Sequence, residues 1–480
     1  MMAFLHGTRV KELETGLKVF TDVAAPTVIV GTATVNMGDE SCVNEPVLIQ
    51  SPKDAAMYFG TTANIKGFTI NEAIYLATNV YNTFPIIAIN VLDPKKHKTA
   101  GSVQDLVLIE DKVILEQTGI ILNENLVIKD AATDVPLAKE KYNLKFNNEG
   151  HLEVEVTQRD STTKISVDYE YADPKKVTEN DVIGNINPET LEASGLQALK
   201  EIFPKFSMIP ACVIAPDFAT SKIAVALDAK SQIISNKWAS FSIPELPKDI
   251  KYGEAVSYKK QKNYIDTDQL ICFGVPYLDK EVFKMSTVAA LHMQAVDTMN
   301  DGIPYESPSN KNIKMHGIGY YSDGNFKKLN LDETEANQLG ANGICTILTR
   351  SNGTVFWGNR TSVYQPGGNT DPKDIWIPVK RMFKYIGNTL MLNNENEVDK
   401  PMTPARAKSI ETNANVWLAS LVAQGKLLGA KVAFLPEENS EQDMSNGRYK
   451  WHVYIGSVIP GESLEFILEY DGKYLKEFYK

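Results

Sequence analysis

The last residues of the chain carry a strong strand signal beside a free end. Residues 464–470 alternate large apolar side chains with mostly acidic ones, and an Ile-Pro-Gly break at 459–461 separates them from the preceding module. A period of two predicts a β-strand. Because such a strand presents unpaired N–H and C=O groups, it needs a sheet edge, in this molecule or in another. The pattern points to assembly before it points to catalysis.

The first part of the chain predicts an α/β sheet. The apolar run at residues 27–30, closed by Gly31, is typical of a strand buried on both faces. Apolar residues spaced by three and four over 70–84 predict a helix, and a strand-like run at 86–92 follows it. This order implies a right-handed crossover unit. From Pro188 onward the same pattern resumes, so we expect the same sheet to continue.

Two copies of Asp-Pro-Lys-Lys, at 93–96 and 173–176, enclose a stretch of different character. It consists of short apolar and β-branched runs divided by turn residues, including Asn-Asn-Glu-Gly at 147–150 in an expected hairpin. We interpret it as an inserted β-sandwich or barrel with closely spaced ends. The two copies are either a true repeat or a chance recurrence of turn-forming residues. The boundary of the inserted domain is the same in both cases.

The last third of the chain predicts a hairpin and two helices. Two strand-like runs within 343–358 flank a Ser-Asn-Gly turn. An apolar stripe predicts a helix over 379–390, and Thr403 with Pro404 marks the capped start of the next one. We therefore divide the chain into an N-terminal arm (1–22), a first core part (23–95), an inserted β domain (96–180), a second core part (181–372), a C-terminal domain (373–458) and a C-terminal strand extension (459–480).

Charge and hydropathy exclude several classes of partner. The net charge is −11, from 49 basic and 60 acidic side chains, and no long basic block occurs, so we expect neither a nucleic-acid nor a membrane partner. No stretch approaches the ~20 apolar residues of a membrane span, and the N-terminus lacks a signal-peptide pattern. We expect a product made and used without Sec export.

The four cysteines predict buried free thiols. Cys42, Cys212, Cys272 and Cys345 lie far apart in apolar or strand-like settings, without the spacing of a zinc ribbon or a redox pair. This usage is typical of a reducing cytoplasm.

Motifs that carry chemistry are missing. The sequence has no phosphate-binding Gly-x-x-x-x-Gly-Lys-Ser/Thr loop, no Gly-x-Ser-x-Gly elbow and no His-Glu-x-x-His spacing. The glycine-rich stretch 317–324 runs into no evident helix, so we interpret it as a loop and not as a dinucleotide site. His292 is expected to be a packed helix residue. Triads can be scattered along a sequence, so a hydrolase is disfavoured but not excluded.

Three basic residues share one face of the expected helix at 379–390. Lys380, Arg381 and Lys384 lie on a face other than the apolar stripe. They form either a solvated surface or a binding surface, and spacing alone favours the solvated surface.

Five segments of the chain carry a resemblance to a known family. They are 6–10 with Glu12, 196–199, the hairpin ending in 356–360, 400–404 and 420–425. Together they resemble the contractile-tail sheath proteins of myophages and phage-tail-like bacteriocins. The likeness is loose over 25–92 and good from Pro188 to the end, while the β insertion contributes nothing specific. The order of the motifs along the chain is more specific than any one of them.

The resemblance implies a structural protein without enzymatic activity, cofactor or metal. It implies an α/β core of subtilisin-like topology that is not catalytic, with an inserted all-β domain, an α+β C-terminal domain and extended terminal arms. Such subunits stack as hexameric rings around an inner tail tube and contract. The resemblance also implies residues that donate strands to neighbouring subunits and residues that contact the tube. The first set is Arg9, Val10, Lys11, Leu464, Phe466, Leu468 and Tyr470. The second is Lys380, Arg381 and Lys384.

The implied partners are further copies of the chain, the inner tail tube protein, the baseplate and the tail terminator. The implied location is a virion or a phage-tail-like particle, assembled in the host cell cytoplasm. Two other classes stay open at this point. One is an α/β hydrolase or peptidase with an accessory β domain. The other is a secreted adhesin built from β modules, which the missing export signal and the free cysteines disfavour.

Overall fold

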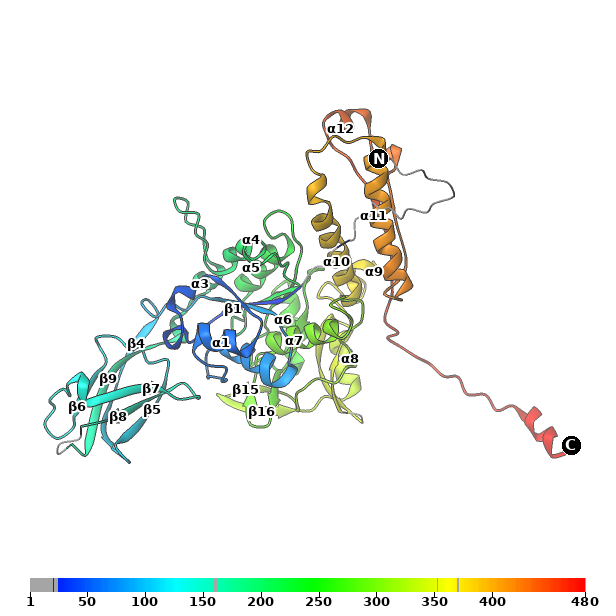
Figure 1. The fold of residues 1–480 in the computed structure, drawn as a ribbon. Coiled ribbons are helices and arrows are strands. Elements are labelled where there is room, and N and C mark those ends of the chain that lie inside the picture. The colour runs from blue at the N-terminus through cyan, green and yellow to red at the C-terminus, as the bar shows by residue number, and fades with distance from the viewer. Residues whose placement is uncertain (1–19, 21–24, 159–161, 352, 369–370, 480) are drawn as a thin grey trace, which may run out of the picture. The chain divides into compact units, whose positions relative to one another are not determined.

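The computed structural model describes residue 20 and residues 25–158, 162–351, 353–368 and 371–479 (Figure 1). The chain forms two compact units. We call Ala25–Met382 with Ile459–Lys480 the core unit, and Met1–Ala24 with Phe383–Val458 the C-terminal unit. The six-part division expected from the sequence does not coincide with these two units and stays a prediction.

The core unit is built on a mixed sheet with the strand order β11-β10-β1-β3-β2. Strands β11, β10, β1 and β3 are parallel, and β2 pairs antiparallel with β3. All residues of β1 and β3 are buried, as their continuous apolar sequences predict for strands covered on both faces. The strands are β1 (Thr27–Gly31), β2 (Pro46–Ile49), β3 (Ile86–Asn90), β10 (Cys212–Ile214) and β11 (Phe241–Ile243).

The sheet continues beyond β11. A parallel bridge between Ser242 and Gln269 leads to β12 (Ile271–Cys272), which pairs in parallel with β17 (Ile344–Arg350). Strand β17 then forms an antiparallel hairpin with β18 (Gly353–Trp357). The continuation of one sheet after the insertion and the hairpin near the Ser-Asn-Gly turn are both confirmed.

Helices of the core unit pack around this sheet. Helix α7 (Met285–Thr298) is deeply buried, with twelve of its 14 residues buried. The helix expected over residues 70–84 is α2 (Thr69–Tyr75), which continues as one π-helical segment, Leu76–Tyr81. The other α-helices of this unit are α1 (Pro52–Phe59), α3 (Glu179–Ile183), α4 (Ile202–Phe206), α5 (Ser221–Gln232), α6 (Tyr252–Gln261), α8 (Glu333–Gly340) and α9 (Pro372–Ile375).

The glycine-rich stretch 317–324 is a strand and its turn, so the expectation of a loop is wrong. It lies in a four-stranded antiparallel sheet of order β14-β13-β15-β16. Gly319 pairs with Lys328 across the ladder, and a Cβ added at Gly319 would lie 2.3 Å from the carbonyl oxygen of Lys327. The missing side chain therefore permits close strand pairing. The strands are β13 (Val275–Leu278), β14 (Glu281–Val282), β15 (Gly317–Ser322) and β16 (Asn325–Leu329).

The insertion is a sandwich of two three-stranded antiparallel sheets with an apolar core of its own. The sheets have the orders β4-β9-β6 and β5-β8-β7. Its two ends meet where the N–H of Asp173 donates to the carbonyl of His97 at 2.8 Å. The strands are β4 (Lys98–Val107), β5 (Lys112–Thr118), β6 (Val127–Asp130), β7 (Tyr142–Phe146), β8 (His151–Val156) and β9 (Lys164–Ala172).

Both Asp-Pro-Lys-Lys copies make the same turn. The carboxylates of Asp93 and Asp173 each accept from the backbone N–H two residues on, at 2.9 and 3.0 Å. This is ordinary turn chemistry of aspartate and agrees with a recurrence of turn-forming residues.

The C-terminal unit holds two long helices and a hairpin. Helix α10 (Ile377–Asn394) crosses the boundary between the units, and α11 (Pro404–Ala423) begins as expected, with Thr403 accepting from the N–H of Arg406 at 3.2 Å. The ring of Phe20 stacks on Trp417, with centroids 5.4 Å apart. The remaining elements are β19 (Leu427–Ala433), α12 (Glu441–Ser445) and β20 (His452–Ser457).

The terminal segment forms no strand within the single chain. Residues 458–471 have no regular secondary structure, and a 3-10 helix over Gly472–Tyr479 follows them. The alternating residues 464–470 therefore pair with no strand in the described part of this chain.

Candidate functional site

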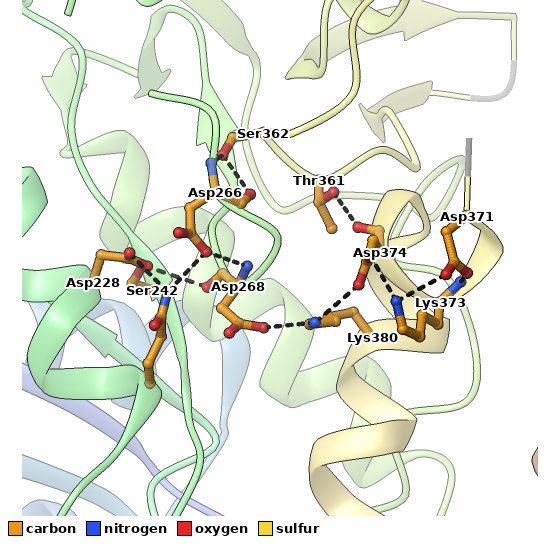
Figure 2. Close-up of polar contacts among 11 residues, drawn as sticks. Asp228, Ser242, Asp266, Asp268, Thr361, Ser362, Asp371, Lys373, Asp374 and Lys380 are labelled. Atoms are coloured by element: carbon orange, nitrogen blue, oxygen red, sulfur yellow. Dashed lines mark hydrogen bonds and ion pairs between the residues drawn. The ribbon is translucent and has the colours of Figure 1, made fainter. Parts of the chain in front are cut away.

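The start of α10 is tied to the core unit by a charged network (Figure 2). Asp371 caps α9 by accepting from the N–H of Lys373 at 3.0 Å. One turn into α10, the ammonium of Lys380 lies 3.2 Å from Asp374 and 3.3 Å from Asp268. Lys380 is thus shared between a carboxylate of α9 and a carboxylate of the loop after α6.

Behind Lys380 lies a cluster of carboxylates. The amide of Gln232 donates to Asp228 and to Asp266, at 2.9 Å each, and Ser362 binds the backbone of Asp266. Burial raises the pKa of Asp228 to about 7, with the charge of Asp266 and a hydrogen bond to it as the next causes. Near neutral pH the Asp228 carboxyl therefore holds a proton for part of the time, which relieves repulsion from its acidic neighbours.

Arg381 does not belong to an exposed charged surface, and the sequence-based expectation is wrong for this residue. It is 5% exposed and forms a two-pronged ion pair with Asp297 at the end of α7, with Nη1–Oδ1 at 3.0 Å and a second contact from Nη2. Burial raises the pKa of the Asp297 carboxyl, while Arg381 opposes the shift. The guanidinium anchors the start of α10 to the deeply buried helix α7.

Lys384 lies one turn further, in the C-terminal unit, and is half-buried. The structure thus places Lys380 and Arg381 in two separate ion-paired contacts, Lys380 with Asp268 and Asp374 and Arg381 with Asp297. Asp268 and Asp297 were missed by sequence reasoning. Both are far from α10 along the chain, and no local spacing marks them as its partners.

The C-terminal extension, which we define as residues 459–480, is held at its start and exposed beyond it. The guanidinium of Arg360 donates from Nε to Glu462 at 3.2 Å and stacks on the ring of Trp376 at 3.6 Å. Beyond this point the large apolar side chains are exposed to solvent by more than half of their surface. Their exposed fractions are 79% for Leu464, 85% for Phe466, 87% for Ile467, 94% for Leu468, 81% for Tyr470, 71% for Tyr474 and 53% for Leu475.

These values place the four expected strand-donation residues of this end, Leu464, Phe466, Leu468 and Tyr470, on an unpartnered segment. The other three, Arg9, Val10 and Lys11, lie outside the described residues. Their role stays a prediction.

No catalytic or metal constellation emerges from the described residues. His292 is buried in α7 as expected, 3.0 Å from the carbonyl of Pro308, and burial lowers its pKa to about 4. Across the described ranges, no group of three or more His, Cys, Asp or Glu side chains could hold a metal ion. The four cysteines are free and buried, as predicted. Within those same ranges, no helix is both long and apolar enough to cross a membrane.

Comparison with known proteins gives full-length matches, although no family model matches the chain. The tail sheath protein of Burkholderia phage BcepMu is 24% identical over 489 residues, which cover 98% of each chain. Among solved structures, the sheath complex of an extracellular contractile injection system, PVC, in its contracted state has a TM-score of 0.59 at 12% identity, covering 99% of each chain. A baseplate structure of the anti-feeding prophage has a TM-score of 0.57 at 13% identity, covering 98% of this chain and 100% of that one.

The fold is therefore that of a contractile sheath subunit, with mixed α/β content and several sheets. The sequence match agrees with this: over nearly its whole length the chain is similar to a phage tail sheath protein, as its motifs predicted. It is a structural protein and not an enzyme, and its location is a virion or a phage-tail-like particle.

The Arg381–Asp297 pair leads to a stability prediction. Asp297→Asn leaves the buried guanidinium without its counter-charge, and we expect the free energy of unfolding to fall by about 3–5 kcal/mol. Urea denaturation measures it. As a control, Glu333→Gln removes the exposed partner of Arg350 and should change stability by about 0–1 kcal/mol. Equal effects of the two substitutions would contradict an anchoring role for Arg381.

The raised pKa of Asp228 leads to a pH prediction. In the folded chain this carboxyl titrates near pH 7, against 3.8 as its ordinary value, so the folded state binds more protons between these limits. Stability contributed by the site is therefore present at about pH 4 and is lost as the pH rises through 7. The free energies of unfolding of the wild type and of Asp228→Asn are measured at pH 5 and pH 8. Relative to the wild type, we expect the variant to be more stable at pH 8 than at pH 5. A difference independent of pH would contradict the assignment.

Proposed function

We propose that the chain polymerises as stacked hexameric rings around an inner tail tube, and contracts to drive the tube through a target envelope. The observation that carries this proposal is the C-terminal extension, whose apolar side chains from Leu464 to Leu475 lack cover in a single chain. The similarity in sequence to tail sheath proteins and a structural neighbour captured as a contracted sheath support it. The anti-feeding prophage baseplate neighbour supports a baseplate partner for this chain as well.

The extension is proposed to join the sheet of a neighbouring subunit as an added strand. A segment such as 464–470 can form about six backbone hydrogen bonds, each contributing roughly 0.5 to 1.5 kcal/mol. This amounts to several kcal/mol per joint before any apolar burial. The N-terminal arm, including Arg9, Val10 and Lys11, is proposed to act in the same way. Head-to-tail joints of this kind do not close on themselves and so generate a helical polymer.

Contraction is proposed to draw its energy from a difference in subunit contacts between two arrays. The extended sheath is then a trapped state, and the cores rotate and move outward into a better-packed array while the donated strands keep them tethered. Two discrete packings of the same interfaces suffice for such a transition. The absence of a phosphate-binding loop from the sequence is consistent with a transition that uses no nucleotide.

The start of α10 is proposed to contact the inner tube. Lys380 and Lys384 are the candidate contacts, and Arg381 is assigned the role of a buried anchor that holds the helix in place. Polar contacts in water are weak enough to break during contraction. A tail terminator is proposed as a further partner.

The parallel order β11-β10-β1-β3 supports a subtilisin-like topology for the core, which we also propose. No observation favours a hydrolase or an adhesin, because the described residues hold no metal cluster and the relatives are sheath proteins.

Deleting Pro460–Lys480 tests the proposed function. The truncated chain should fold, because its remaining residues keep their own cores, and should lose the ability to polymerise. Circular dichroism measures the fold, and negative-stain microscopy counts tubes. A folded, truncated chain that still forms tubes at the wild-type level would refute strand donation.

The tube contact is tested by Lys384→Glu. We expect sheath assembly on purified tubes to fall at least tenfold, while tube-free polymerisation, which is proposed to depend on the C-terminal extension, continues. Lys400→Glu is the control, because Lys400 is an exposed cation of the same unit, paired with Glu397. Wild-type co-sedimentation of the Lys384→Glu chain with tubes would remove the assignment.

A further inference from the structure

Arg360 is fixed to the start of α10. Its backbone forms an antiparallel bridge with Trp376, the residue before α10, and the N–H of Thr361 donates to the carbonyl of Ile375 at 3.0 Å. The buried ion pair between α10 and α7 holds this end of the helix on the core unit. The backbone of Arg360 therefore belongs to the core unit and follows its movements.

The side chain of Arg360 lies against two aromatic rings. The guanidinium carbon is 3.6 Å from the centre of the Trp376 ring and 4.4 Å from the centre of the Tyr364 ring. Only 13% of the side chain is exposed. A guanidinium stacks on aromatic rings and still presents its N–H groups in one plane. The two rings therefore fix the direction in which Arg360 donates hydrogen bonds.

The acceptor of these hydrogen bonds is Glu462, near the start of the C-terminal extension. Nε of Arg360 donates to Oε1 at 3.2 Å, and Nη2 donates to Oε2. Such a two-pronged bond to a carboxylate is stronger and more directional than a single one. The Glu462 side chain is 43% exposed, so the carboxylate is hydrated when the pair opens. The pair therefore holds the extension but opens at a far smaller cost than the buried Arg381–Asp297 pair.

The pair shortens the free chain before the segment 464–470. The extension follows β20, which belongs to the C-terminal unit, whereas Arg360 belongs to the core unit. From Ser457, the last residue of β20, to Leu464 the extended chain spans at most ~24 Å. From Glu462 to Leu464 it spans at most ~7 Å. With the pair closed, the segment therefore follows the core unit closely. With the pair open, it follows the C-terminal unit on a longer tether.

We propose that the Arg360–Glu462 pair is a latch, closed in the extended sheath, which opens during contraction and lengthens the connection between a core and the strand that it has donated. The inference rests on the proposed strand donation and concerns the donor subunit alone. In the proposed contraction the cores move outward while the donated strands stay joined. A closed pair keeps the start of the strand within ~7 Å of Glu462, so a larger movement requires the pair to open. Arg360 is thus a positioning residue for the proposed movement.

Spin labels test the latch in the single chain. Cysteines replace Val225, which is 66% exposed on α5, and the exposed Ser463, while the four native cysteines are buried. Double electron–electron resonance then measures the distance between the two labels. We expect one narrow distribution, which becomes at least twofold wider in Glu462→Gln because the amide lacks the charge. Glu437→Gln removes an exposed carboxylate of the C-terminal unit and should leave the width unchanged.

A covalent bridge tests the movement in the sheath. In the variant with Arg360→Cys and Glu462→Cys, a short bis-maleimide added before assembly replaces the ion pair with a link that cannot open. We expect the bridged chain to assemble at the wild-type yield, and its sheaths to contract at least tenfold less often under the same trigger. Without the bridge, the same variant should contract at least as often as the wild type. Circular dichroism confirms folding, and electron microscopy counts extended and contracted sheaths.

Each contrary result has a distinct meaning. An unchanged width of the distance distribution in Glu462→Gln would show that the ion pair does not hold the extension. Bridged sheaths that contract as often as wild-type ones would show that the pair need not open, and bridged chains that fail to assemble would show that it is open in the extended sheath. Any of these results would overturn the inference. Assembly of the chain that lacks residues 460–480 would instead refute the proposed strand donation, and would leave the spin-label result unaffected.

Discussion

Unpaired backbone in the C-terminal extension is the constraint on which the account depends. From Leu464 to Leu475 the large apolar side chains are more than half exposed, and no strand of the described chain pairs with residues 464–470. Peptide groups and apolar side chains in such a row find their complement at a sheet edge. In a single copy the apolar side chains of this segment are exposed to water, and the proposed strand donation would gain free energy by covering them.

A connection through donated strands, as proposed, holds an array together only if the subunits that it connects are stiff. The core unit meets this need with a sheet whose central strands are fully buried and with α7 packed on nearly all sides. The start of α10 is held by the buried Arg381–Asp297 pair and by Lys380 between two carboxylates. Breaking a buried pair is costly, whereas an added edge strand can move with its neighbour. Rigid bodies with pliable connections can exchange one packing for another without coming apart.

The sequence predicted the parts of the fold that depend on local periodicity. The apolar run of β1, the stripe of α2 and the capped start of α11 at Thr403 all depend on residues close to one another along the chain. The prediction from sequence failed for residues whose contact partner lies far away along the chain. Arg381 was counted as polar surface because its spacing is helical, and its burial depends on Asp297, 84 residues away. The strand β15 was taken for a loop because no evident helix follows its glycines, and the close approach of Lys327 to Gly319 is not visible in the sequence. Family resemblance, and not periodicity, supplied the contractile function.

A helical reconstruction of the assembled sheath by cryo-electron microscopy, at a resolution that shows side chains, measures the central claim most directly. The account predicts density for residues 464–470 as a strand added to a sheet of a neighbouring subunit, with the side chains of Leu464, Phe466 and Leu468 covered. Density showing this segment folded onto its own subunit, or standing in solvent with no neighbour beside it, would contradict the account.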